Sequence, residues 1–159
     1  HLQPVDFLKI SLPVGAWILL RLITSFCGVF GFSIMFNSPV RLAATAAGIG
    51  AIANTLRLEM VDMTAIPPAG AAFVGALTAG ILASLIKSKV GYPRISLTVP
   101  SIVIMVPGMY LYRGFYNLGI MSLGPAASWF ASAILIIAAL PLGLIFARIL
   151  TDETFRYCT

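Results

Sequence analysis

The stretch "VPSIVIMVPGMYLYRGFYNL", residues 99–118, decides how the chain folds, because it places helix breakers inside an apolar run long enough to cross a membrane. A proline inside a helix removes a backbone hydrogen bond, so Pro107 is expected to free the carbonyl of Val103, and Pro100 an earlier one. Gly108 adds a backbone that turns freely. Because an unpaired carbonyl is costly in hydrocarbon, the break is expected to face protein or a water-filled cavity.

Apolar residues dominate the rest of the chain as well. Of 159 residues, 60% are hydrophobic and 9% are charged, a balance that excludes a soluble domain of this size. Stretches of membrane-spanning length occur at residues 14–36, 40–56, 67–86, 96–117 and 126–148. The sequence therefore predicts an all-α integral membrane protein, in which residues 1–159 form one transmembrane domain of about five helices, the fourth broken at Pro107–Gly108. The second stretch is rich in Ala and Gly, which contribute little to insertion, so a four-span organisation stays open.

The residue patterns of an enzyme, a metal site or a cofactor site do not occur in this sequence. The single histidine is His1, no glycine-rich phosphate loop is present, and the five acidic residues lie outside the apolar stretches. Cys27 lies within a span and Cys158 is the penultimate residue, so they suggest no disulfide framework. The net charge of +5 is not organised into a basic patch with aromatic residues, and nucleic acid is not an expected partner.

The charges outside the spans predict an orientation. With five spans, three cations fall on the side of the N-terminus (Lys9, Arg57 and Arg113) and six on the other (Arg41, Lys87, Lys89, Arg94, Arg148 and Arg156). Because Lys and Arg concentrate in cytoplasmic loops, we expect the N-terminus outside and the C-terminus in the cytoplasm, with the protein in the cytoplasmic (inner) membrane. Arg21 lies inside the first span, where reaching out to the interface is favoured over binding substrate.

Small residues recur every four positions in three of the spans. The third span carries two such ridges (Ala71, Gly75, Ala79, Ala83 and Ala72, Ala76, Gly80, Ser84), and shorter ones occur in the second (Ala43, Ala47, Ala51) and the fifth (Ala139, Gly143, Ala147). Small residues let helices approach closely in lipid, so these faces are expected to bury against other helices, either of this chain or of a partner. Asn54 is expected to form a hydrogen bond to another helix.

The fourth span carries the candidate substrate site. At helical spacing its polar-lined face holds Thr98, Ser101, Met105, Gly108 and Tyr112, and Arg113 follows at once. The candidate substrate-binding residues are Thr98, Ser101, Pro107, Gly108, Tyr112 and Arg113. Two interpretations stay open: a kinked helix that Arg113 anchors to lipid headgroups, or a substrate path where Arg113 and the N–H groups at the break receive a carboxylate.

A second motif lies between the first two spans. Asn37 tolerates turn geometry, Pro39 favours the start of a helix, and Arg41 suits the membrane interface, so the sequence predicts a tight structural turn here.

Two segments carry a family resemblance, "GFSIMFNSPVR" at residues 31–41 and "PSIVIMVPGMYLYRG" at residues 100–114. With them the chain resembles the YjjB and ThrE threonine/serine exporter family, as its small integral-membrane subunit or the C-terminal half of its fused members. The resemblance places the family's proline-glycine break at Pro107–Gly108, its tyrosine and arginine at Tyr112 and Arg113, and its turn at Asn37 to Arg41.

The resemblance implies a secondary exporter of threonine and serine, or of a dicarboxylate such as succinate. It further implies a partner, either a YjjP-like larger membrane subunit or a second copy of the chain. Two other functions stay open from the residues themselves: a scaffold or assembly subunit that does not transport, and a small-solute channel.

Overall fold

The computed structural model describes residues 13–64 and 66–152, and these residues form helices joined by short connections. The helices are α1 (Val14–Met35), α2 (Val40–Met63), α3 (Pro68–Val90), α4 (Arg94–Val103), α5 (Gly108–Gly119) and α6 (Leu123–Thr151). The all-α class predicted from the sequence is confirmed. His1, Lys9, Arg156 and Cys158, which entered the sequence predictions, lie outside the described residues.

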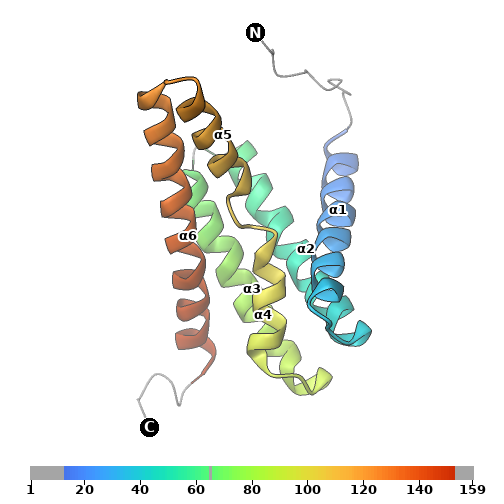
Figure 1. Ribbon diagram of the computed structural model, residues 1–159. Helices are drawn as coiled ribbons and strands as arrows, with labels where there is room; N and C mark the ends of the chain where they lie inside the picture. The colour runs from blue at the N-terminus through green and yellow to red at the C-terminus, as the bar shows by residue number, and fades with distance from the viewer. Residues whose placement is uncertain (1–12, 65, 153–159) are drawn as a thin grey trace.

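The helices run side by side along one axis, and α1, α2, α3 and α6 each take the chain from one end of the bundle to the other (Figure 1). The pair α4 and α5 makes one such pass together, bent by 40° at the connection between them. We call the end where α1, α3 and α6 begin the upper end, and the opposite end the lower end. The predicted break in the fourth span is thus confirmed.

Three of the described helices, α1, α3 and α6, are long and apolar enough to cross a membrane, and the bent pair makes a fourth candidate. The remaining helix, α2, packs between α1, α3 and α4. Eight of its 24 residues are Ala or Gly, and six of these eight are buried, so neighbouring helices cover the small residues that contribute little to insertion. This position explains why hydropathy alone finds α1, α3, α6 and the bent pair but not α2, although α2 runs alongside them in the bundle (Figure 1).

The small-residue ridges are used inside the bundle. Every member of the two ridges on α3 is buried except Ser84, and α3 packs against α2, α4 and α6. At the seam with α6 the backbones nearly touch: a Cβ added to Gly143 would lie 2.5 Å from the carbonyl oxygen of Phe73, and one added to Gly80 would lie 2.5 Å from the Cβ of Ala147. Of the two uses that the sequence left open, internal packing accounts for these faces.

Gly143→Ala should therefore lower the free energy of unfolding by about 1–3 kcal/mol, since the added methyl group meets a backbone carbonyl that cannot give way. Gly31→Ala, in α1, is the matched control because an added Cβ there meets nothing within 4 Å. Thermal unfolding in detergent measures the difference. If the two variants unfolded at the same temperature, the close approach of α3 and α6 would not be as described.

The connection from α1 to α2 is tight. Asn37 adopts a left-handed conformation (φ 57°), and the Ser38 N–H donates to the Ser33 carbonyl at 3.1 Å. Pro39 precedes the first turn of α2, and Arg41 is exposed at the lower end. Each of the three residues named for the turn thus occupies it or the helix start directly after it.

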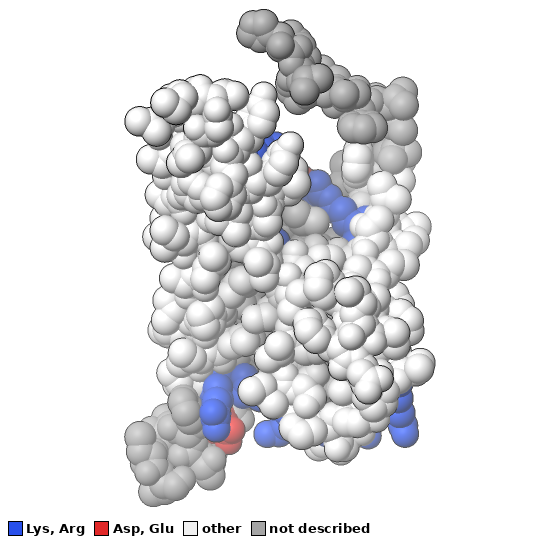
Figure 2. Space-filling view, in the orientation of Figure 1, with Lys and Arg blue, Asp and Glu red and all other residues white. Residues whose placement is uncertain are grey.

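The described charges separate by end. The lower end carries mainly cations (Arg41, Lys87, Lys89, Arg94 and Arg148, with Asp152), and the upper half carries charges of both signs (Arg21, Arg57, Arg113, Glu59 and Asp62). Figure 2 shows the lower cations as a blue fringe, while the middle of the molecule is almost entirely uncharged. An uncharged belt between two charged ends is the pattern of a protein that spans a bilayer.

Candidate functional site

The break in the fourth pass lies at residues 104–107. The helix α4 continues through Pro100 and ends at Val103, and α5 begins at Gly108. Between them the side chains of Met105 and Pro107 are buried. The expectation that the Val103 carbonyl is left free is wrong, because it accepts a hydrogen bond from the Val106 N–H at 3.2 Å. The chain tightens into a turn at this point, and that turn supplies the donor that Pro107 lacks.

Below the break, Thr98 and Ser101 lie in the core. The Ser101 hydroxyl donates to the carbonyl of Ala46 on α2 at 3.0 Å and to that of Leu97 at 2.5 Å. The Thr98 hydroxyl donates to the Arg94 carbonyl at 3.2 Å. In this conformation the Ser101 hydroxyl therefore holds α4 against α2, and that of Thr98 bonds within its own helix.

Above the break, the other candidate residues lie on the surface of α5. A Cβ added to Gly108 would meet nothing within 4 Å, and Tyr112 is 65% exposed. The Arg113 guanidinium lies 4.8 Å from the ring centroid of Trp129 on α6, a cation–π contact. The break thus divides the polar face expected from helical spacing: its lower residues point into the core, while Gly108 and Tyr112 are exposed.

A residue that sequence reasoning left in a loop, Arg57, lies beside the break. The helix α2 continues through the polar run to Met63, so Arg57 sits within a helix. Its Nη1 donates to the Asn54 side-chain oxygen at 3.2 Å, and Asn54 in turn donates to the Ser25 hydroxyl on α1 at 2.9 Å. The bond from Asn54 to another helix, expected from the sequence, is confirmed. The Nε of Arg57 is buried and has no hydrogen-bond partner within the described residues.

Gly75 of α3 shows how close Arg57 is to the break. A Cβ added at Gly75 would lie 3.2 Å from the Cβ of Arg57 and 3.2 Å from the sulfur of Met105. One missing side chain therefore leaves room for both the stem of Arg57 and the buried methionine of the break. The stem of Arg57 and the break therefore pack against the same point of α3.

A second arginine, Arg21, is already neutralised. Its guanidinium pairs with Glu59 at 2.7 Å and with Asp62, both on the last turns of α2. These ion pairs give Arg21 partners within the protein, and its expected reach toward the membrane interface stays a prediction. Because Arg21 holds both of these carboxylates, no carboxylate among the described residues pairs with Arg57.

The upper half of the molecule is hollowed between α5 and α1, and Lys or Arg side chains are visible inside the hollow (Figure 2). The helix α5 packs against α6 and leaves this side open. We call this hollow the upper recess. The described part of the upper half holds three arginines and two carboxylates (Arg21, Arg57, Arg113, Glu59 and Asp62), a net charge of 3 − 2 = +1. A broken helix in a half of the molecule with net positive charge suits a small anion or a carboxylate.

A family model described as "Threonine/Serine exporter, ThrE" matches residues 21–150 of the chain. The chain belongs to the threonine/serine exporter family. The matched residues run from Arg21 to the last turns of α6, so the break, Arg57 and Arg113 all lie within the family domain. Neither the curated proteins nor the solved structures compared with the chain gave a match.

The family is one of transporters and not of enzymes, and this exporter-type chain is a multi-pass membrane protein. The resemblance noted in the two sequence motifs is thereby confirmed.

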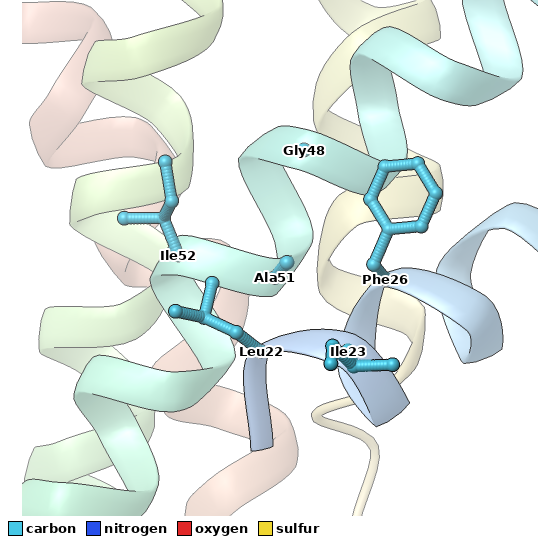
Figure 3. Close-up of a pocket in the computed structure, with 6 residues that line it drawn as sticks. All are labelled: Leu22, Ile23, Phe26, Gly48, Ala51 and Ile52. Carbon is cyan, nitrogen blue, oxygen red and sulfur yellow. The ribbon is translucent and has the colours of Figure 1, made fainter. Parts of the chain in front are cut away.

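The exporter chain also has an apolar groove between α1 and α2, of about 380 Å³. Figure 3 shows the residues that line it: Leu22, Ile23, Phe26, Gly48, Ala51 and Ile52. Their side chains present only carbon, so the groove offers no hydrogen bond to a polar substrate. The upper recess is the better candidate for the transport site.

Proposed function

We propose that this chain is the membrane-embedded half of a secondary exporter that moves threonine, serine or a small dicarboxylate such as succinate out of the cytoplasm. One observation carries the proposal: Arg57, partly buried beside the broken helix, has no carboxylate partner among the described residues. Family membership supports transport of this class.

The proposed role of Arg57 in substrate binding follows from the free-energy cost of burying its charge. A cation removed from water needs a counter-charge, and a protein that leaves it without one loses stability. The carboxylate of a substrate supplies that charge, and the guanidinium can donate two parallel hydrogen bonds to it. Because Asn54 accepts from Nη1, the Nε–H is the donor without a hydrogen-bond partner within the described residues; it is buried in this conformation, so substrate would reach it only when the helices around it move.

The residues named from the sequence form the rest of the proposed site. Pro107 is the N-cap of α5, which begins at Gly108; the N-terminal end of this helix carries a partial positive charge, and Arg113 adds a full one on the same helix. Tyr112 and Arg113 would meet the substrate at the rim of the recess. Thr98 and Ser101 would contribute from α4, below the break. Their hydroxyl groups would exchange their present hydrogen bonds for others when α4 moves.

Alternating access would use the bend between α4 and α5 as its hinge. In this conformation α4 packs against α2 and α3 below the break, while α5 stands away from α1 above it. The upper recess is then the open side, and movement of α4 away from α2 would open the other. A hinge of a few residues between packed segments is the usual means of such motion.

We propose that the upper end faces outside and the lower end faces the cytoplasm of a bacterial-type inner membrane, since the described cations concentrate at the lower end. The N-terminus is then outside and the C-terminus cytoplasmic.

Cysteine labelling in intact cells tests this orientation. In a background without Cys27 and Cys158, Met121→Cys at the upper end should react with a membrane-impermeant maleimide, because this position is 83% exposed. Lys89→Cys, exposed at the lower end, should react only after the cells are permeabilised. The opposite pattern would invert the orientation.

The proposed partner is a YjjP-like larger membrane subunit or a second copy of this chain, which would cover the open side of the upper recess. The small-residue faces are occupied inside the bundle, which argues against a scaffold held together by those faces. Efflux of radiolabelled threonine, serine and succinate from vesicles, with and without the larger subunit, tests the proposal. If none of the three were exported in either preparation, the exporter function would be excluded for these substrates.

A further inference from the structure

A second charged cavity lies at the lower end, between α3, α4 and α6, far along the bundle from the upper recess. Its volume is about 440 Å³. Three cations line it, Lys87, Arg94 and Arg148, together with one carboxylate, Asp152. The lining therefore has a net charge of 3 − 1 = +2. The charged side chains of this cavity have no part in the proposed transport mechanism, although Thr98, which that mechanism uses, also lines the cavity.

Both arginines in this cavity contact side chains near the end of α6. Arg148 pairs with Asp152 at 3.8 Å, one helical turn away. The Nη1 of Arg94 donates to the Thr151 hydroxyl at 3.1 Å, but its Nη2 is buried and has no hydrogen-bond partner within the described residues. The Nη2 atom lies toward the seam of α3 and α6, since a Cβ added to Gly80 would be 3.3 Å from it, so the hydrogen bond to Thr151 and this burial fix the guanidinium at the edge of the cavity. A fixed guanidinium beside two further cations suits an anion with several oxygen atoms.

The other side of the same cavity is apolar. Ile95 and Val99 of α4 and Ile145 of α6 line it. These three side chains are also exposed on the outside of the bundle, so the apolar wall continues onto the surface that faces lipid. A soluble anion would gain nothing from this wall, whereas a ligand that combines a phosphate with a hydrocarbon chain would use both halves.

The level of the cavity along the bundle agrees with such a ligand. Lys87 lies in the last turn of α3, Arg94 begins α4, and Arg148 lies in the last turn of α6. These positions place the cations where the hydrocarbon core gives way to lipid headgroups. We propose that the cavity binds the phosphate group of an anionic phospholipid, with an acyl chain lying along Val99 and Ile145.

Lipid titrations of the full-length protein in detergent, followed by native mass spectrometry, test this site. The probes are phosphatidylglycerol, phosphatidylcholine and inorganic phosphate. Wild-type protein should bind phosphatidylglycerol more tightly than phosphatidylcholine, and millimolar phosphate should not displace it. Full displacement by phosphate alone would show a site for a free anion and overturn the lipid proposal, as would equal binding of the two lipids.

Lys87→Gln should weaken phosphatidylglycerol binding about fivefold, the effect expected for one cation at an anionic membrane surface. This variant tests the site without risk to the fold, because Lys87 makes no ion pair within the described residues. Lys89→Gln is the matched control, since Lys89 lies on the same helix end and does not line the cavity. The double variant Lys87→Gln/Arg94→Gln should bind weaker still, and equal binding by Lys87→Gln and Lys89→Gln would contradict the assignment.

Discussion

Arg57→Gln should lower the rate of export about tenfold to a hundredfold while the protein remains folded in the membrane. The range corresponds to the loss of one charge-assisted hydrogen bond to the substrate carboxylate. Thermal stability should stay the same or rise, because the substitution removes a partly buried charge that has no carboxylate partner among the described residues. Efflux from vesicles and thermal unfolding in detergent measure the two effects separately.

Two further variants make this result specific. Arg41→Gln removes an exposed cation at the lower end and should leave export unchanged. Asn54→Asp keeps Arg57 but places a carboxylate where the Asn54 oxygen now accepts from the guanidinium at 3.2 Å. This internal carboxylate should compete with the substrate and reduce export in the presence of an intact Arg57. Export at the wild-type rate by Arg57→Gln would remove the residue from the site.

Gly50→Val should lower the free energy of unfolding by about 3 kcal/mol or more, the largest effect on stability that we expect from a single substitution. Gly50 lies where α1, α2 and α4 meet. A Cβ there would lie 2.8 Å from a methyl carbon of Val29 and 2.9 Å from the carbonyl oxygen of Ser101. The contact with Ser101 is to backbone, so relief requires a whole helix to shift.

Gly48→Val is the control, because Gly48 lies two positions away on the same helix and an added Cβ meets nothing within 4 Å. Both substitutions place a β-branched residue in α2, so their helix propensities cancel in the comparison. Gly48→Val should yield a monodisperse protein in size-exclusion chromatography, and Gly50→Val should yield little. Equal yields and equal stability to unfolding would mean that α1, α2 and α4 do not meet at this glycine.

The sequence was sufficient to predict the class of protein and the position of the break. Apolar runs of spanning length define the helices, and a proline followed by glycine in one of them marks the interruption at Pro107. Both signals depend only on neighbouring residues, so they can be recognised without knowledge of the fold. The small-residue ridges likewise predicted burial, although spacing alone did not say which helices they would meet.

Residues whose roles depend on distant partners were harder to place. The segment with Arg57, Glu59 and Asp62 was predicted to be a polar loop. Its two carboxylates pair with Arg21, but Arg21 precedes Glu59 by 38 positions, so the sequence alone does not reveal the pairing. With that ion pair unknown, nothing indicated that α2 continues to Met63. One signal in the sequence could have identified Arg57. If Arg21, inside the first span, pairs with the two acidic residues Glu59 and Asp62, then no acidic residue nearby in the sequence remains to pair with Arg57.

Helical spacing also assumed a continuous helix through the break. It grouped Ser101 with Tyr112 on one face, but the bend of 40° separates the two ends of that face. The carbonyl of Val103 was expected to be open for the same reason, since the turn that satisfies it exists only once the chain has bent. A helical wheel predicts which residues share a face only within one continuous helix.

The central claim is that a substrate carboxylate binds at Arg57 beside the broken helix, and equilibrium binding to the purified protein tests it most directly. The ligands are L-threonine and succinate, each compared with its amide, in which the carboxylate is replaced by a neutral group of similar shape. The account predicts that at least one acid binds about tenfold or more tightly than its amide, and that Arg57→Gln abolishes this preference. If the acid and amide bound equally well, or if the preference survived in Arg57→Gln, the account would be contradicted.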